Sequence, residues 1–484
     1  MKTFFKYGLA IFILIIAVFF ITNYFVAQKI EGLLAKESTL SYADINVNAF
    51  AGSMSLEDVI FDESTNKLEI KNINLNVDII RYLLHKEIKI ESIDAEGLDL
   101  KLKLATNSNP KPKRKKINIV GIQELNVSDA QITAENEIKT ILVTENVNLY
   151  ATDISWPLDE HLNWLKNKSI TIDAKKLTYN LDQLHDLKSE SFSYADKSIT
   201  FKGFSLKPKF SKANYINQIQ KQTDLMNLNT KTLAISGFDL KKEDSLYSIM
   251  AQKIDIDSTN FNIYRDKTIA PDTSLKALYS QALRDLKFRL AVDSLTVADM
   301  NLVYQELLKK NRSPGELKLN SINGQITNIH NTLNAPEPDI EAKFKAKFTK
   351  GSDIYFNWSF VPDHDYFSLS TLLQNVEDES VNNFFAPAMN MKMDGTINKI
   401  ETSFSGNNTQ MNGDFKIAYK KLKLNILKKD GSKNNFASLL SNVFVNNRDV
   451  DKTYQLKEVK RDQTKSFWNY VWTYHLNGLK KVLL

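Results

Sequence analysis

Apolar residues recur along this chain in one short phrase that is written eight times. The phrase reads apolar–x–apolar–x–small–apolar–polar–apolar, and its small residue is Gly, Asp, Asn or Ser. Alternating apolar residues are typical of a half-buried β-strand, but here the alternation slips by one residue at the fifth position. The copies begin at Met54, Leu68, Ile93, Leu125, Ile199, Leu233, Ile254 and Leu295, and the first and seventh are imperfect.

The slip predicts a strand that bends while it keeps one apolar face. A one-residue slip turns the apolar side chains outward unless a bulge absorbs an extra residue. Gly, Asp and Asn tolerate the backbone angles that some bulges and bends require. The copies are irregularly spaced, which argues against a solenoid or propeller of fixed period. We therefore predict a long, meandering, antiparallel sheet with connections of variable length.

A few segments interrupt the strands with apolar residues at helical spacing. Residues 78–86, 156–167, 212–227 and 275–286 are the internal candidates for short helices. Residues 465–484 place large aromatic side chains on one face of a terminal helix. That helix either lies on a membrane or docks onto the last edge of the sheet. We favour docking because an exposed sheet edge needs a cover.

The N-terminal segment predicts a membrane anchor. Residues 7–27 carry no charge and are long enough to cross a bilayer core of ~30 Å as a helix. Lys2 and Lys6 precede the segment, which favours a cytoplasmic N-terminus with the rest translocated. Phe25 and Ala27 do not form a small–x–small cleavage site, so an uncleaved anchor is favoured over a signal peptide. The predicted anchor residues are Leu9, Ile11, Phe12, Ile13, Leu14, Ile15, Ile16, Val18, Phe19, Phe20 and Ile21.

Composition indicates a folded chain and excludes several kinds of chemistry. Of its 484 residues, 25% are charged and 43% are hydrophobic, which separates it from disordered proteins. Part of the net charge of +6 lies in residues 111–116, where Pro110 and Pro112 favour a solvated loop over a nucleic-acid site. Cysteine is absent, which excludes disulfides, thiolate catalysis and cysteine zinc sites.

Local catalytic motifs are missing from the sequence. Asp363, His364 and Asp365 form the one local cluster that suits a metal, but carboxylates beside a His in a Pro-initiated turn are common without one. The chain has no zinc-protease motif, nucleophile elbow, phosphate loop or dinucleotide-binding glycines. We therefore expect a protein that is not an enzyme and has no cofactor, metal or nucleic-acid partner. A hydrolase built from carboxylates distant in sequence stays open as a minor hypothesis.

The apolar face of the predicted sheet needs a cover, and the helical segments look too short to supply it. An open trough would shelter lipid chains, since moving an acyl chain of about 16 carbons through water costs ~12 kcal/mol. A closed β-sandwich would produce the same alternation. The candidate groove-lining residues are Leu98, Leu100, Leu102, Leu104, Ile254, Ile256, Leu295, Val297, Ala342, Phe344, Ala346, Phe348, Leu422 and Leu424.

Three stretches of the chain carry a resemblance. Residues 70–102 form a strand, short amphipathic helix and strand after the anchor, and residues 393–430 form long C-terminal strands. Residues 283–328 contain Tyr304, Glu306, Pro314, Gly315, Asn323 and Gly324. In these stretches the chain resembles the AsmA-like family of repeating β-groove proteins, relatives of TamB, and the middle stretch is similar to Bacteroidetes-type members. The resemblance implies an inner-membrane anchor and a periplasmic β-groove, with a role in lipid movement or outer-membrane homeostasis and without catalytic residues.

Together these observations predict a mainly β protein. Its N-terminal transmembrane helix precedes a long, bent, antiparallel sheet that forms an open hydrophobic groove with a few short helices. The expected function is binding of phospholipid acyl chains in the periplasm, with membrane lipids as partners and other envelope proteins or self-association as further contacts. The alternative is a structural or interaction module that affects outer-membrane protein assembly without carrying lipid. The predicted segments are 1–6 (cytoplasmic tip), 7–28 (anchor), 29–105 (strand–helix–strand), 106–116 (basic loop), 117–330 (central groove), 331–430 (C-terminal groove) and 431–484 (linker and aromatic helix).

Overall fold

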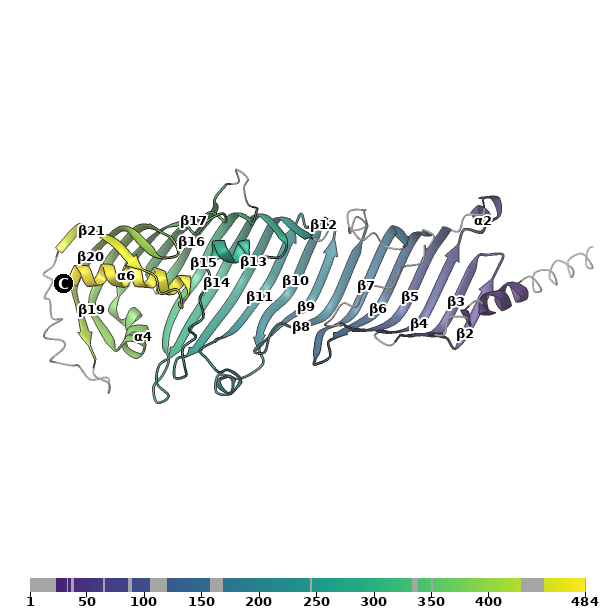
Figure 1. Cartoon of the computed structure of the whole chain (residues 1–484), viewed down its shortest axis with the longest axis horizontal. Coiled ribbons are helices and arrows are strands. Elements are labelled where there is room, and N and C mark those ends of the chain that lie inside the picture. Colours follow the sequence, from purple (N-terminus) through teal and green to yellow (C-terminus); the bar gives the residue numbers. More distant parts are fainter. Residues whose placement is uncertain are drawn as a thin grey trace, which may run out of the picture. The chain divides into compact units, whose positions relative to one another are not determined.

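Strands dominate the computed structural model, as the sequence predicts. The 21 strands of the described residues belong to one mixed, open sheet, accompanied by a few helices (Figure 1). The chain divides into two compact units, Met1–Leu181 with Lys188–Phe201, and Asp182–Leu187 with Lys202–Leu484. The structure describes residues 23–32, 34–35, 39–63, 66–85, 89–104, 120–156, 169–243, 246–332, 338–349, 351–427 and 448–483.

The first unit is built from consecutive strands that pair with their neighbours. From β3 to β8 each strand is antiparallel to the next except for β5 and β6, which are parallel. The prediction of an antiparallel sheet is therefore wrong for this pair. Parallel strands need a connection that returns the chain to the end where the first strand began, and the alternation of apolar residues does not report such a connection. The elements are β1 (Leu40–Ser41), β2 (Asp44–Asn48), β3 (Ser53–Glu63), β4 (Asn66–Val77), α2 (Ile79–His85), β5 (Lys89–Lys103), β6 (Val120–Glu135), β7 (Thr140–Trp156), β8 (Thr171–Asn180) and most of β9 (His185–Ala195).

The second unit also contains one parallel pair, β13 with β14. The connection between these two strands carries the short helix α3. All pairs from β14 to β21 are antiparallel. The elements are most of β10 (Ser198–Pro208), η2 (Tyr215–Gln218), β11 (Asp224–Ser236), β12 (Asp239–Glu243), β13 (Leu246–Asp266), α3 (Tyr279–Arg284), β14 (Arg289–Leu307), β15 (Gly315–His330), β16 (Ile340–Thr349), β17 (Ser352–Phe360), β18 (Phe367–Glu377), α4 (Asp378–Met389), β19 (Met391–Gly406), β20 (Gln410–Ile426), β21 (Arg448–Lys460) and α6 (Phe467–Leu483).

The fifth position of the repeated phrase is a bend, as predicted. In seven of its eight copies the residue there has a positive φ, between 49° and 67°, which is the left-handed region. The copy that begins at Leu68 is the exception. At Gly97 a Cβ atom would also lie only 2.9 Å from the Cβ of Lys71. The other residues with this geometry are Asp58, Asp129, Gly203, Gly237, Ser258 and Asp299.

The bends of β3, β4 and β5 differ from the predicted bulge in one respect. Leu56 pairs with Ile73, and beyond the slip Val59 pairs with Ile70, so no residue is extra in either strand. The pairing of β4 with β5 stays in step in the same way. Neighbouring strands therefore slip together at the same level, and each keeps its apolar side chains on the common face. This explains why the phrase recurs, because one strand that lacked the slip would present its apolar residues to the wrong side.

Asparagine side chains stabilise the bend of β14 and β15. The backbone N–H of Asp299 donates to Asn323 Oδ1 (3.0 Å), and that of Ser321 donates to Asn301 Oδ1 (3.2 Å). Asp299 and Ser321 both have a positive φ. Each strand thus caps the bend of the other, which satisfies N–H groups that the irregular ladder leaves free.

The helix predictions had mixed outcomes. Those for residues 78–86, 275–286 and 465–484 are confirmed by α2, α3 and α6, within shorter bounds. The helix predicted at 212–227 is wrong, since only η2 forms and β11 begins at Asp224. Tyr215 explains the difference, because its ring is fully buried and its hydroxyl accepts a hydrogen bond from the N–H of Asp266 (2.8 Å). The helix predicted at 156–167 lies outside the described residues, except for Trp156, which ends β7.

Residues 7–22 of the predicted anchor, which include all of its named residues, lie outside the described residues, as does the basic run at 111–116. Within the part of the chain that the structure describes, no helix combines the length and the apolar character needed to cross a membrane. That part begins with helical residues 23–32, where Tyr24 and Phe25 are largely exposed.

Candidate functional site: an apolar sheet face

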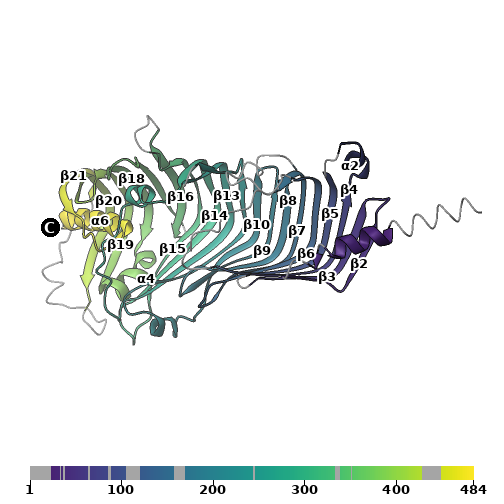
Figure 2. The same cartoon turned by 45° about the vertical axis from the view of Figure 1, so that its right-hand side comes forward.

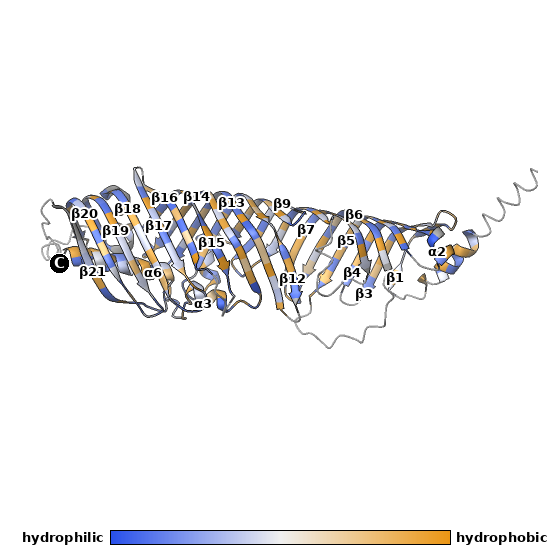
Figure 3. Cartoon of the chain, turned by 90° about the horizontal axis from the view of Figure 1, so that it is seen from above, coloured by the Kyte–Doolittle hydropathy of each residue, from blue (hydrophilic) through white to orange (hydrophobic). Residues whose placement is uncertain are grey.

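In the first unit, the bends align apolar side chains into rows that cross the strands. One row joins Leu68, Leu100 and Ile132, and the row beyond it joins Leu102 with Ala134. Hydrophilic and hydrophobic residues alternate along the strands, so the opposite face is polar (Figure 3). Among the described residues of this unit no second sheet covers the apolar face, and the side chains of Leu98, Leu100 and Leu102 are only half-buried.

In the second unit, β11, β13, β14 and β15 carry a similar face. Its rows run across all four strands, and most of their apolar side chains are half-buried. We call this surface the open face. Its rows are Met226–Ile263–Tyr304–Leu317, Leu228–Phe261–Leu302–Leu319, Thr230–Thr259–Met300–Ile322, Leu233–Ile256–Val297–Gly324 and Ile235–Ile254–Leu295–Ile326.

The helix α6 covers the same side of the sheet over its last strands (Figure 1). The ring of Tyr474 stacks on Phe404 of β19 with centroids 4.1 Å apart. Gly478 lies directly on the ring of Phe415 in β20, where a Cβ atom would meet ring carbons at 2.3 Å. The helix α4 lies at the same end of the sheet as α6 (Figure 2). The ring of Phe385 in α4 lies 5.9 Å from that of Trp472 in α6. This end of the face is therefore a dry core, and α6 docks across several strands instead of onto the last edge alone.

Polar groups of α6 and the sheet form a short, partly buried network. His475 Nδ1 donates to the carbonyl of Val471 (2.9 Å), which leaves Nε2 to accept from the hydroxyl of Thr371 (3.1 Å). Thr371 also contacts the hydroxyl of Thr402 (2.7 Å). Burial lowers the pKa of His475, so the imidazole is held neutral. Docking of α6 therefore favours the neutral form of the His475 imidazole.

Aromatic side chains mark the boundary between the open face and the covered end. Trp468, the second residue of α6, is half exposed, and its ring lies 5.5 Å from that of Phe356 in β17. Its Nε1–H donates to the hydroxyl of Tyr279 in α3 (3.1 Å). Phe356 pairs with Phe344, which pairs with Gly324 of the open face. The apolar rows of the open face therefore continue to the aromatic side chains of Phe356 and Trp468.

A row of charged residues borders the open face at the ends of β13 and β14. In the pairing register Asp224, Arg265 and Glu306 stand side by side on β11, β13 and β14. Arg265 donates two hydrogen bonds to Asp224, from Nε (2.7 Å) and Nη2 (2.6 Å). Lys267 Nζ lies 2.7 Å from Glu306, and the hydroxyl of Tyr304 donates to the same carboxylate (2.8 Å). We call Asp224, Arg265, Glu306 and Lys267 the charged row.

The charged row is partly sheltered from water. The side chains of Asp224, Arg265 and Lys267 are about one-third exposed, at 30%, 29% and 31%, whereas that of Glu306 is 9% exposed. Burial alone would lower the pKa of Arg265, but the hydrogen bonds and charge of Asp224 outweigh it and raise that pKa. Burial, and next the Glu306 carboxylate, raise the pKa of Tyr304 well above its ordinary value. Both groups therefore stay protonated and act as donors.

The cluster of Asp363, His364 and Asp365 is not brought together. Asp365 accepts hydrogen bonds from Arg284 Nη2 (2.6 Å) and Ser280 Oγ (2.8 Å), while Asp363 and His364 are exposed. Burial alone would raise the pKa of Asp365, but Arg284 and Ser280 outweigh it and lower that pKa. Across the described ranges of the chain, no group of three His, Asp or Glu residues is arranged to hold a metal ion.

The predicted groove-lining residues fall into three environments. Leu98, Leu100, Leu102, Ile254, Ile256, Leu295, Phe344 and Phe348 are half-buried, and Leu104 is 47% exposed. Val297, Ala342, Ala346 and Leu422 are buried, while the side chain of Leu424 lies outside the described residues.

Sequence reasoning missed the charged row. A signal was present, because the apolar phase of β13 runs Thr259, Phe261, Ile263 and then reaches Arg265. A charged residue in the apolar phase of a strand faces the side that its neighbours keep apolar.

Comparison with known proteins yields no match to a protein-family model and no match to a curated protein. The resemblance to the AsmA-like family therefore stays a prediction from the sequence.

Proposed function

We propose that this protein binds the acyl chains of phospholipids on its apolar sheet face. In this proposal it is held in the bacterial inner membrane by its N-terminal segment and extends into the periplasm. There it acts in lipid transport or outer-membrane homeostasis. The observation that carries the proposal is the open face, where side chains such as Phe261 and Leu302 lie in continuous apolar rows and stay half-buried.

The energetics favour such a ligand. Each methylene group that leaves water is worth ~0.8 kcal/mol, so a chain of about 16 carbons carries ~12 kcal/mol. Binding on the open face recovers much of that energy and also removes exposed protein surface from water. Neither gain needs a catalytic group. The rows from Ile254 to Ile263 span ten residues of β13, and the nine steps of ~3.3 Å between the two ends make about 30 Å of strand. An acyl chain spans half of a ~30 Å bilayer core, so it fits along this length.

One observation favours the second candidate, an interaction module that carries no lipid. Beneath α6 the apolar face is already closed by protein, with Phe415 and Tyr474 fully buried. That end needs no ligand. The two candidates therefore differ in what they predict for the open face, where the described residues supply no such helix over Leu228 or Phe261.

The test is the lipid content of the full chain purified in mild detergent, measured by native mass spectrometry. Phe261→Glu places a charge in the middle of the open face, and Asn262→Glu places the same charge on the exposed face of the same strand. We expect the wild type and Asn262→Glu to retain phospholipid. Phe261→Glu should lose most of it, because a carboxylate on an apolar surface costs several kcal/mol to desolvate.

Circular dichroism establishes that both variants fold. A wild-type chain that carries no phospholipid would refute the proposal. Equal lipid content in the two glutamate variants would also refute it for the open face, and either result would support the interaction module.

A further inference from the structure

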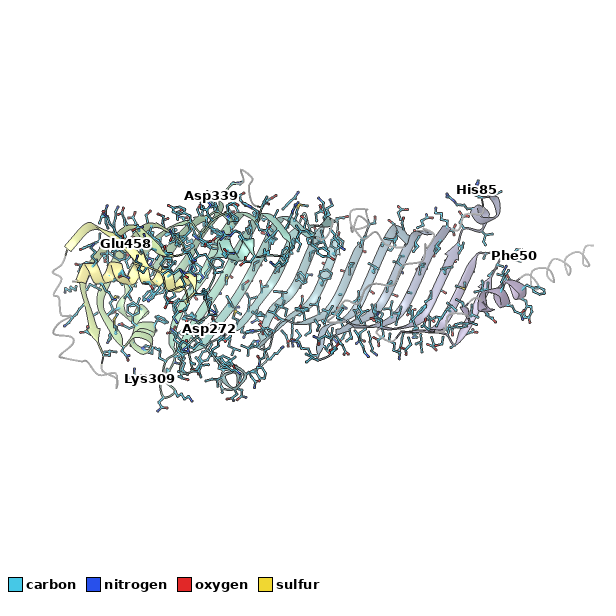
Figure 4. The ribbon with its side chains drawn as sticks, viewed as in Figure 1. Phe50, His85, Asp272, Lys309, Asp339 and Glu458 are labelled. Atoms are coloured by element: carbon cyan, nitrogen blue, oxygen red, sulfur yellow. The ribbon has the colours of Figure 1, made fainter. Side chains whose placement is uncertain are left out.

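The charged row lies at one edge of the open face. Asp272 follows the end of β13 and Lys309 follows the end of β14, and both lie at this edge of the sheet (Figure 4). Asp339, just before β16, lies at the opposite edge. The neighbouring row of the open face contains Ile263 and Tyr304, and the next contains Phe261 and Leu302. A polar border therefore adjoins apolar rows on one surface, which is the arrangement that an amphipathic ligand requires.

The signs of the charges alternate along this border. Asp224, Arg265, Glu306 and Lys267 supply two negative and two positive groups, so their formal sum is zero. A ligand with only a negative group would pair with Arg265 or Lys267 and leave a sheltered carboxylate without its partner. That loss is costly, because a partly buried charge that loses its partner keeps its desolvation penalty. A ligand with both signs avoids it.

We propose that the charged row recognises a phospholipid headgroup that carries both a phosphate and a primary ammonium group. The phosphate pairs with Arg265 and Lys267, and the ammonium group donates to Glu306 and Asp224. This inference rests on the proposed binding of acyl chains and adds the headgroup class that the face selects.

Spacing and hydrogen-bond chemistry support this choice of headgroup. Arg265 and Glu306 stand on adjacent strands, which are ~4.8 Å apart. An ethanolamine headgroup separates its phosphate and ammonium groups by two carbons, a span of the same order. The guanidinium group of Arg265 presents a planar fork that suits phosphate oxygens. A primary ammonium has three N–H donors for carboxylates, whereas the quaternary ammonium of choline has none.

The experiment measures which lipids the full chain retains after incubation with vesicles. The vesicles contain equal amounts of phosphatidylethanolamine, phosphatidylglycerol and phosphatidylcholine with the same acyl chains, and retained lipids are quantified by mass spectrometry. We expect phosphatidylethanolamine to exceed phosphatidylglycerol by about tenfold, the value of one charge-assisted hydrogen bond. Glycerophosphoethanolamine, which has the headgroup without acyl chains, should not be retained.

Glu306→Gln removes one carboxylate, and Asp224→Asn removes the other. Either change should abolish the preference for phosphatidylethanolamine over phosphatidylglycerol. Asp255→Asn is the matched control, because Asp255 pairs with Lys253 (2.8 Å) on the opposite face of β13. It should leave the preference unchanged.

The outcomes separate this inference from the proposed function. Lipid retained by the wild type without a headgroup preference would overturn the inference alone, as would a preference that survives both carboxylate changes. Retention of no lipid at all would overturn the proposed function as well. Retention of the soluble headgroup compound would show that the row binds the polar group without the apolar face, and it would also overturn the inference.

Discussion

Replacing Gly478 with alanine tests whether α6 is docked on the sheet. In an isolated helix this change is stabilising by ~1 kcal/mol, because glycine is a poor helix former. In the docked helix the new methyl group would lie 2.3–2.6 Å from three ring carbons of Phe415. The isolated and the docked helix therefore predict opposite signs for the change in stability, so the sign of the measured change decides the test.

The magnitude follows from the space available at this contact. Ordinary contacts of a Cβ atom begin at 3.4 Å, so α6 or the ring of Phe415 must move by about 1 Å. Phe415 has no free space to move into, since its side chain is fully buried. Overpacking of this kind costs up to ~3 kcal/mol, and the gain in helix propensity returns ~1. The expected net loss for α6 is ~2 kcal/mol, which corresponds to an opening about 30-fold more frequent.

Hydrogen exchange of the α6 amides measures this opening directly. Asn469→Ala, at an exposed position of the same helix, is the control and should leave exchange unchanged or slightly slower. Combining Gly478→Ala with Phe415→Leu should recover part of the loss, because the smaller side chain makes room for the methyl group. Slower exchange in Gly478→Ala alone would refute the docked position of α6.

Two further predictions concern the bend and the histidine of α6. Asp299→Val should destabilise the second unit by ~2 kcal/mol in urea unfolding, because φ is 50° there and a β-branched residue is strained, whereas Asp299→Gly should be tolerated. A loss with glycine as large as with valine would contradict this reading. Burial lowers the pKa of His475 in the docked state, so an undocked α6 binds the proton more readily. Docking should be complete above pH ~7 and weaken as pH falls below ~6.5, and His475→Gln should remove this dependence of α6 exchange on pH.

The sequence predicted the strands and their bends because both depend on local signals. At Asp58, Gly97 and Asp299 the small residue stands at the position where the apolar alternation shifts by one residue. What the sequence did not reveal is that neighbouring strands slip at the same level. That property depends on pairing, as between Leu56 and Ile73, and pairing is a relation between distant parts of the chain.

The missed features depend on tertiary contacts in the same way. The helix predicted near Tyr215 yielded to the burial of that ring and its hydrogen bond to Asp266. The parallel pairing of β13 with β14 was missed because alternation reports which face a residue takes and not the direction of its strand. The charged row was missed because Asp224, Arg265 and Glu306 are separated by about 40 residues each and meet only through strand register.

The open face and the covered end are two solutions to one physical problem. Strands on both parts of the sheet present an apolar face that favours a cover. Over β19 and β20 the cover is α6, whose Tyr474 and Gly478 fit the rings of Phe404 and Phe415 closely. Over Leu228 of β11 and Phe261 of β13 the described residues place no such helix, and charged residues border the face at the ends of β13 and β14. A helix whose side chains fit particular rings of the sheet covers only that part of the face. Acyl chains, in contrast, fit any continuous apolar row. The open face offers continuous apolar rows in place of closely fitted contacts, and such a surface suits a ligand that must both bind and leave.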